Sequence, residues 1–130
     1  MTKLGIILSH KLIDKQINDA KKTLGICDFI YLPSDLQLLW SNIPPDLPVI
    51  KDYLYNIFRW IEVTFSKGDV IIVQGDFGAV YLVVCFCKIK GFKVVYSTTK
   101  RNVIENQNSD GTINTTRRFE HILFREYEDI

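Results

Sequence analysis

The sequence predicts an α/β fold, in which a mostly parallel open sheet carries helices on both faces and ends in a C-terminal β-hairpin. Apolar, β-branched segments alternate with amphipathic segments along the chain, the order typical of parallel strands joined by helical crossovers. Asn108-Ser109-Asp110-Gly111 is a strong turn signal near the end of the chain and predicts the hairpin. A chain of 130 residues can bury a core of its own, so we expect one domain over residues 1–130.

The strands are predicted from short apolar segments that are bounded by polar residues or glycine. We expect parallel strands at Lys3–Leu8, Asp28–Leu32, Val70–Gln74 and Phe92–Tyr96. The hairpin is expected to pair residues 102–107 with residues 112–127 across the turn.

The helices are predicted from apolar residues spaced three and four apart. We expect them at about residues 12–24, after Ser34, and at 49–65 and 79–90. Ser34 and Gln37 fit a capping box, in which each side chain bonds the backbone of the other.

Residues 79–87 suit a strand as well as a helix. The apolar stretch continues to about twelve residues and Gly91 stands where a helix would end, which favours a buried helix with Asp76 as its N-cap. The three prolines of residues 41–48 predict a fixed loop, which we expect Ile43 and Leu47 to anchor.

Composition and charge exclude several classes of function. Sixteen Lys and Arg residues against fifteen Asp and Glu residues leave a net charge of +1, so we expect no long nucleic-acid partner, and any anion site must be local. No apolar run is long enough for a membrane span. Three cysteines without a framework spacing predict reduced thiols and a cytoplasmic protein. We expect no cofactor and no metal, because no His, Asp, Glu or Cys cluster has ligand spacing and Cys85 and Cys87 would point to different sides of a helix.

Three polar clusters follow predicted strands: Ser9-His10-Lys11, Gln74-Gly75-Asp76-Phe77-Gly78, and Ser97-Thr98-Thr99-Lys100-Arg101. The carboxyl ends of parallel strands share one edge of a sheet, so these clusters should meet there. A fourth cluster, Thr115-Thr116-Arg117-Arg118, lies in the hairpin, and we expect it to fold back over the same edge. Hydroxyls, backbone amides and cations together suit a ligand with several phosphates. The chain has no Walker-type glycine loop and no G-x-G-x-x-G, so this is not an ordinary nucleotide pocket.

Each cluster also has a purely structural alternative. Gly75 and Gly78 could serve only to turn the chain, and His10 could be a cap or a surface residue. Residues 98–101 could be a solvated loop, and one of Arg117 and Arg118 is expected to point into solvent, because neighbours on a strand face opposite sides.

A resemblance extends these inferences. Ser9-His10, the Trp40–Pro45 segment, Gln74–Gly78, Thr98–Arg101 and Thr115–Arg117 occur in an order and spacing that resembles the small standalone CRISPR-associated proteins of the Csx type, a CARF-like family found with type III systems. The resemblance covers essentially the whole chain and implies a Rossmann-like, CARF-like domain. It also implies a ring nuclease, which binds and cleaves a cyclic oligoadenylate messenger, first of all cyclic tetra-adenylate, and so switches off type III signalling. The alternative is a non-catalytic sensor or sink for the same messenger.

Cleavage of such a ring needs no external water, because a ribose 2′-OH can attack the adjacent phosphate and leave a 2′,3′-cyclic phosphate. The protein must hold that geometry and neutralise the growing charge, without a metal. We expect His10 to act as general acid or base, with Lys100 and Arg117 as the other catalytic residues. The expected ligand-binding residues are Ser9, Gln74, Gly75, Asp76, Phe77, Gly78, Thr98, Thr99, Arg101 and Thr116. A ring of four identical nucleotides has two-fold symmetry, so we expect a homodimer that presents each cluster twice.

Overall fold

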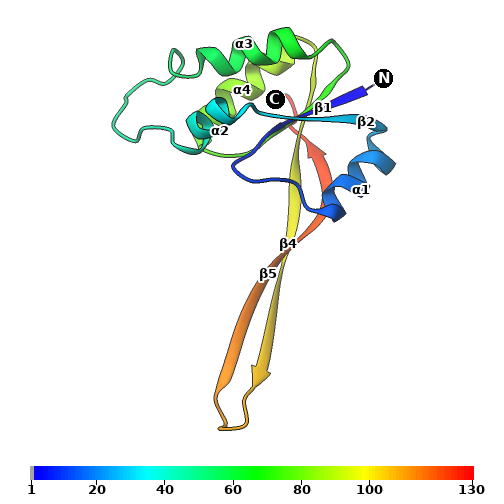
Figure 1. The fold of residues 1–130 in the computed structure, drawn as a ribbon, viewed down its shortest axis with the longest axis vertical. Helices are drawn as coiled ribbons and strands as arrows, with labels where there is room; N and C mark the ends of the chain where they lie inside the picture. The colour runs from blue at the N-terminus through cyan, green and yellow to red at the C-terminus, as the bar shows by residue number, and fades with distance from the viewer. Residues whose placement is uncertain (1) are drawn as a thin grey trace.

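The computed structural model describes residues 2–130 and shows an α/β protein built on one five-stranded sheet (Figure 1). The strands are β1 (Thr2–Ile7), β2 (Ile26–Tyr31), β3 (Val70–Val73), β4 (Lys93–Gln107) and β5 (Ile113–Glu126). Their spatial order is β2-β1-β3-β4-β5; the first four are parallel, and β5 is antiparallel to β4. The expected α/β class is confirmed, and the sheet is mixed because the hairpin forms its edge.

Helices cover both faces of the sheet, as expected from the alternation of strands and helices. They are α1 (Asp14–Thr23), α2 (Ser34–Ser41), α3 (Tyr55–Thr64) and α4 (Phe77–Ile89). Figure 1 shows α1 on one side of the sheet and the other three helices on the opposite side. Neighbouring residues of β1 point to opposite faces, so Ile6 packs with Ala20 of α1 while Ile7 packs with Ile57 of α3 and Val83 of α4.

The segment after β3 is a helix, and the strand alternative for residues 79–87 is wrong. β3 is buried along its whole length, and the chain then turns into α4 through Asp76. The Asp76 carboxylate accepts a hydrogen bond from Ala79 N at 3.0 Å, the contact expected of an N-cap residue.

Three local expectations are wrong. The capping box at Ser34 does not form: α2 already includes Ser34, and Gln37 Nε2 instead donates to Leu8 O at 2.6 Å, which holds the end of the first strand. The third helix begins at Tyr55 rather than near residue 49, because residues 51–54 form turns around the fully buried Leu54. Ile43 packs against the core, but Leu47 is 42% exposed and does not anchor the proline-rich loop.

The largest difference from expectation is the length of β4. It does not end at Tyr96 but continues to Gln107, paired with β5 along the way, so residues 97–101 lie within a strand and not in a loop after it. The polar sequence hides this extension, since both faces of the outer hairpin are exposed. The turn is confirmed, with Asn108 N donating to Thr112 O at 2.7 Å and Gly111 at φ 88°.

The outer part of the hairpin projects away from the rest of the protein (Figure 1). The expectation that residues 115–118 fold back over the carboxyl edge is therefore wrong within one chain. β4 and β5 stay hydrogen-bonded to each other beyond the parallel strands, and their register places residues 115–118 in this outer part of the hairpin. Within residues 2–130, no helix combines the length and the apolar character that crossing a bilayer requires.

Candidate functional site

A cavity of about 200 Å³ lies at the carboxyl ends of β1 and β3, beside the base of the hairpin. Its lining residues are His10, Ile13, Gln16, Gln74, Ser97, Thr99, Phe119 and His121. The strand order changes direction between β1 and β3, and such a switch point is where open α/β sheets bind ligands. The structure thus brings together His10, Gln74 and Thr99, one from each of the three clusters predicted to meet at this edge.

A chain of hydrogen bonds forms one wall of the cavity. His121 Nε2 lies 2.7 Å from Asp19 Oδ2, and His121 Nδ1 lies 2.5 Å from Ser97 Oγ. A carboxylate can only accept, so the neutral imidazole carries its hydrogen on Nε2 and accepts from the Ser97 hydroxyl at Nδ1. His121 is 2% exposed and Ser97 is 8% exposed, while the Asp19 side chain is 19% exposed, so the imidazole and the hydroxyl are the most withdrawn from solvent.

Two glutamines fix the position of Ser97. Gln16 Nε2 donates to Ser97 Oγ at 3.3 Å, while its Oε1 accepts from Ile13 N at 2.9 Å at the start of α1. Gln74 Oε1 accepts from Ser97 N at 2.8 Å. Gln16 and Asp19 are three positions apart and so lie on the same face of α1, which explains how one helix contacts both Ser97 and His121.

The face that contains the cavity continues outward along the hairpin. Side chains of a strand alternate between faces, so Ser97, Thr99 and Arg101 project from the same side of β4. The register pairs Arg101 with Phe119 and Val103 with Arg117, and the Arg101 guanidinium lies over the Phe119 ring, 5.5 Å from its centroid. We call Thr99, Arg101, Phe119 and Arg117 the cavity-side face of the hairpin.

Three predicted residues lie on the other face of the hairpin and away from the cavity: Thr98, Lys100 and Thr116. The Thr98 hydroxyl bonds both the N–H and the carbonyl of Leu123, each at 3.1 Å, where one extra residue of β5 makes a bulge. Lys100 is paired with Glu120, whose carboxyl pKa is lowered by hydrogen bonds from Lys15 and Asn102 and, less, by the Lys100 charge.

Within the Gln74–Gly78 turn, Gly75 has a packing role. Trp40 Nε1 donates to Gln74 O at 3.0 Å, and a Cβ atom on Gly75 would lie 2.9 Å from the same indole nitrogen. Gly75 is therefore required by the packing of Trp40. A Cβ atom on Gly78 would meet nothing closer than 3.6 Å, and Phe77 is 96% exposed.

Ser9 lies at a second cavity, of about 310 Å³, on the far side of His10. Its lining residues are Ser9, His10, Lys11, Tyr31, Leu32, Ser34 and Gln37. His10 thus borders both cavities; its Nδ1 lies 3.1 Å from the Lys11 carbonyl, and the side chain is exposed. An exposed imidazole between two cavities is accessible to a ligand in either.

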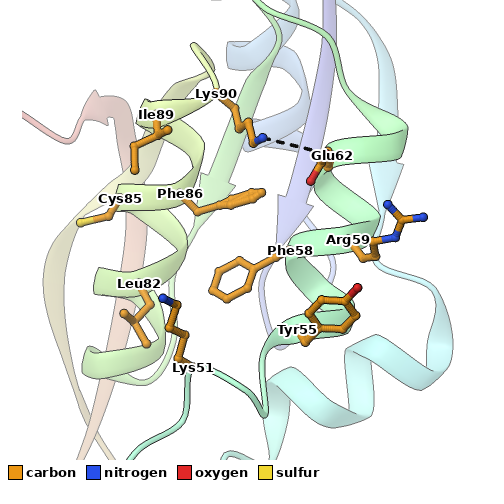
Figure 2. A pocket seen from close by; sticks show the side chains of 10 residues that line it. All are labelled: Lys51, Tyr55, Phe58, Arg59, Glu62, Leu82, Cys85, Phe86, Ile89 and Lys90. Atoms are coloured by element: carbon orange, nitrogen blue, oxygen red, sulfur yellow. Dashed lines mark ion pairs between the residues drawn. The ribbon is translucent and has the colours of Figure 1, made fainter.

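A third hollow, of about 520 Å³, lies between α3 and α4 and contains none of the predicted site residues (Figure 2). The Phe58 and Phe86 rings stack in it at 4.9 Å, and Lys90 Nζ lies 3.9 Å from Glu62 Oε1. We call it the α3/α4 groove. Its surface is mainly apolar, with Lys51, Arg59 and Lys90 among the lining residues, and it shares no residue with the two cavities that His10 borders.

Neither a metal-binding group of side chains nor the Cys87 thiol contributes to the cavity at the carboxyl edge. Among residues 2–130, no group of three or more His, Cys, Asp or Glu side chains is placed to hold a metal ion. Burial raises the pKa of the Cys87 thiol to about 12, which keeps it protonated and unreactive.

These features define a small α/β protein with a polar cavity at the carboxyl edge of its parallel strands and a basic, aromatic hairpin beside it. The chain belongs to the Uncharacterized protein MJ1673 family, whose model matches residues 2–125. It is 48% identical over 127 residues to the Uncharacterized protein MJ1673 of Methanocaldococcus jannaschii, with 98% of each chain covered. No solved structure matches the chain.

Proposed function

We propose that this protein is a ring nuclease, which binds a cyclic oligoadenylate and cleaves it to linear products. The sequence resemblance to Csx-type proteins suggests the ligand. The observation that carries the proposal is the position of Arg101 and Phe119 beside a polar cavity at the β1/β3 switch point. The same sequence resemblance leads us to assign the fold to the Rossmann-like, CARF-like class.

The cavity-side face offers what a ring of adenylates needs. Phe119 is 65% exposed and presents an aromatic surface on which an adenine can stack. Arg101 and Arg117 project from the same side, and a guanidinium can donate two hydrogen bonds to one phosphate. Lys100 projects from the other side, so we assign phosphate binding within one chain to the two arginines.

The reaction in this proposal is attack of a ribose 2′-oxygen on the adjacent phosphorus, with departure of the 5′-oxygen. The protein holds the attacking and leaving oxygens in line, which is mainly a positioning task. Arg117 or Arg101 neutralises charge on the phosphorane, and His10, exposed at the cavity, protonates the leaving 5′-oxygen. The step uses no metal and no external water.

A homodimer completes the site in this proposal. A ring of four nucleotides is larger than a cavity of about 200 Å³, and its two-fold symmetry matches that of a dimer. Loss of the ring would switch off effectors that it activates in type III CRISPR signalling.

The proposal is tested by incubating the protein with cyclic tetra-adenylate, and separately with cyclic hexa-adenylate, in the presence of a chelator. Chromatography is expected to show linear oligoadenylate ending in a 2′,3′-cyclic phosphate. Arg101→Ala should weaken binding about tenfold or more, since a charge-assisted contact contributes about 1.5–3 kcal/mol.

The matched control is Arg59→Ala, which removes an arginine from α3 in the α3/α4 groove and should bind and cleave as the wild type does. Stoichiometric loss of free ligand without linear product would identify a sink or sensor instead. If neither ring binds, the proposal is wrong.

A further inference from the structure

The hydrogen-bonded chain of Asp19, His121 and Ser97 joins residues from three separate elements. Asp19 lies in α1, Ser97 in β4 and His121 in β5, and Asp19 and His121 are 102 positions apart in the sequence. The residues are aligned as carboxylate, imidazole and hydroxyl, with contacts of 2.7 and 2.5 Å. This is the order in which a carboxylate orients an imidazole so that the imidazole can take a proton from a hydroxyl.

A structural role alone does not explain why the hydrogen bonds from Asp19 through His121 end at a hydroxyl in the cavity. A buried histidine that only ties a hairpin to a helix needs partners for its nitrogens, and nothing more. Here the hydroxyl end of the chain and the imidazole itself line the cavity, together with His10, Thr99 and Phe119. Ser97 Oγ also accepts a hydrogen bond from Gln16 and its N–H donates to Gln74, so the hydroxyl is held in one place.

We infer that Ser97 is the catalytic residue that takes the proton from the attacking ribose 2′-OH, and that His121 and Asp19 act through it. This inference rests on the ring-nuclease proposal and adds the general base that the proposal lacks. His10 borders the same cavity and is exposed, which leaves it free for the leaving group.

Protons and bonds balance in this step. The 2′-hydroxyl gives its proton to Ser97 Oγ while the Ser97 proton passes to His121 Nδ1, and Asp19 stabilises the imidazolium through Nε2–H. The 2′-oxygen forms a bond to phosphorus, the bond from phosphorus to the 5′-oxygen breaks, and His10 protonates that oxygen. After release of the product, His121 returns its proton to solvent through Ser97, and His10 is protonated again from solvent.

The test measures the affinity for cyclic tetra-adenylate and the single-turnover rate with enzyme in excess, on the same samples. Ser97→Ala and His121→Gln should each lower the bound rate about 100-fold or more, the scale of a lost general base, with Kd within about twofold of wild type. Asp19→Asn should lower the bound rate by at least about tenfold, because the imidazolium loses its charged partner. A purely structural role would loosen the hairpin and weaken binding through Arg101 and Phe119 as well.

Matched controls make the same chemical changes elsewhere. Ser66 lies before β3, at the amino edge of the sheet, and Asp28 lies in β2. The Ser66→Ala and Asp28→Asn variants should both keep the wild-type rate. Circular dichroism of each variant should give the wild-type spectrum, which checks that the variant is folded. A nitrogen NMR spectrum of the wild type should show His121 with hydrogen on Nε2 and none on Nδ1 when the imidazole is neutral.

The outcomes separate the two proposals. If the wild type cleaves no cyclic oligoadenylate, both are wrong. If the wild type cleaves and Ser97→Ala and His121→Gln keep its bound rate, only the relay is wrong. The opposite tautomer of His121 in the NMR spectrum would also overturn the relay, whatever the variants do.

Discussion

The two glycines of the Gln74–Gly78 turn have different surroundings, and this difference makes a prediction at the scale of single residues. Gly75→Ala should lower the free energy of unfolding by about 1–3 kcal/mol, because its Cβ atom would lie 2.9 Å from Trp40 Nε1 in a packed site. Gly78→Ala should change it by less than about 1 kcal/mol, since Gly78 lies in the first turn of α4 with space around it. Thermal unfolding of both variants checks this. Equal melting temperatures would show that Trp40 does not require the glycine.

A third variant, Gly78→Val, tests the expectation that Gly75 or Gly78 lets a ligand phosphate or ribose approach the backbone. Gly78→Val should abolish ligand binding and leave the melting temperature within a few degrees of wild type, if phosphate contacts this turn. Wild-type affinity in Gly78→Val would mean that the turn is only structural, as the contact of Gly75 with Trp40 already indicates for the neighbouring glycine.

Single residues also show how far the site could be predicted from the sequence. His10, Gln74 and Thr99 were predicted because each belongs to a polar cluster expected at the end of a parallel strand, and such ends share one edge of the sheet. Asp19 and His121 could not be predicted in this way, since they meet only through the register of β5 and its packing on α1. The available signal was that His121 is one of only two histidines in the chain.

At the scale of elements, the hairpin has two chemically different faces, and this predicts which cations act on the ligand. Arg101→Ala and Arg117→Ala should weaken binding or lower the bound rate, because both side chains project from the cavity-side face. A cation that contacts only the developing phosphorane charge lowers the bound rate by about 100- to 1000-fold, whereas one that binds ground and transition states equally changes Kd. Single-turnover and binding measurements separate these effects.

Arg118→Ala is the control for this prediction, since Arg118 is adjacent to Arg117 but projects from the other face. Lys100→Ala tests the residue predicted from the sequence alone. If Lys100→Ala lowers the bound rate and Arg117→Ala does not, then the other face of the hairpin carries the chemistry, and our assignment is reversed.

The helices and parallel strands followed from apolar spacing, the length of apolar segments and their glycine boundaries, whereas the outer part of β4 did not. From Thr99 outward the strand is mostly polar and mostly exposed on both faces, so no burial pattern distinguishes it from a loop. Its backbone is satisfied by β5, which lies beyond the turn in the sequence. The Asp110-Gly111 turn predicted a hairpin. The length of that hairpin is defined only by the pairing of β4 with β5.

At the scale of the whole molecule, the projecting hairpin predicts a dimer. An isolated two-stranded ribbon is marginally stable in water, yet residues 102–118 extend beyond the sheet and expose Val103, Ile104 and Ile113 at 53%, 39% and 62%. We propose that a second copy of the chain covers this ribbon. Light scattering should therefore give the mass of a dimer.

Replacing residues 103–117 with an Asn-Gly turn between the paired Asn102 and Arg118 should give a folded monomer that no longer cleaves the ring. A milder variant with threonine at positions 103, 104 and 113 keeps the strand propensity and should shift the mass toward the monomer. If the shortened chain still dimerises, the hairpin is not the interface, and the α3/α4 groove of Figure 2 becomes the surface to test, by placing lysine at Ile89, which is 83% exposed there.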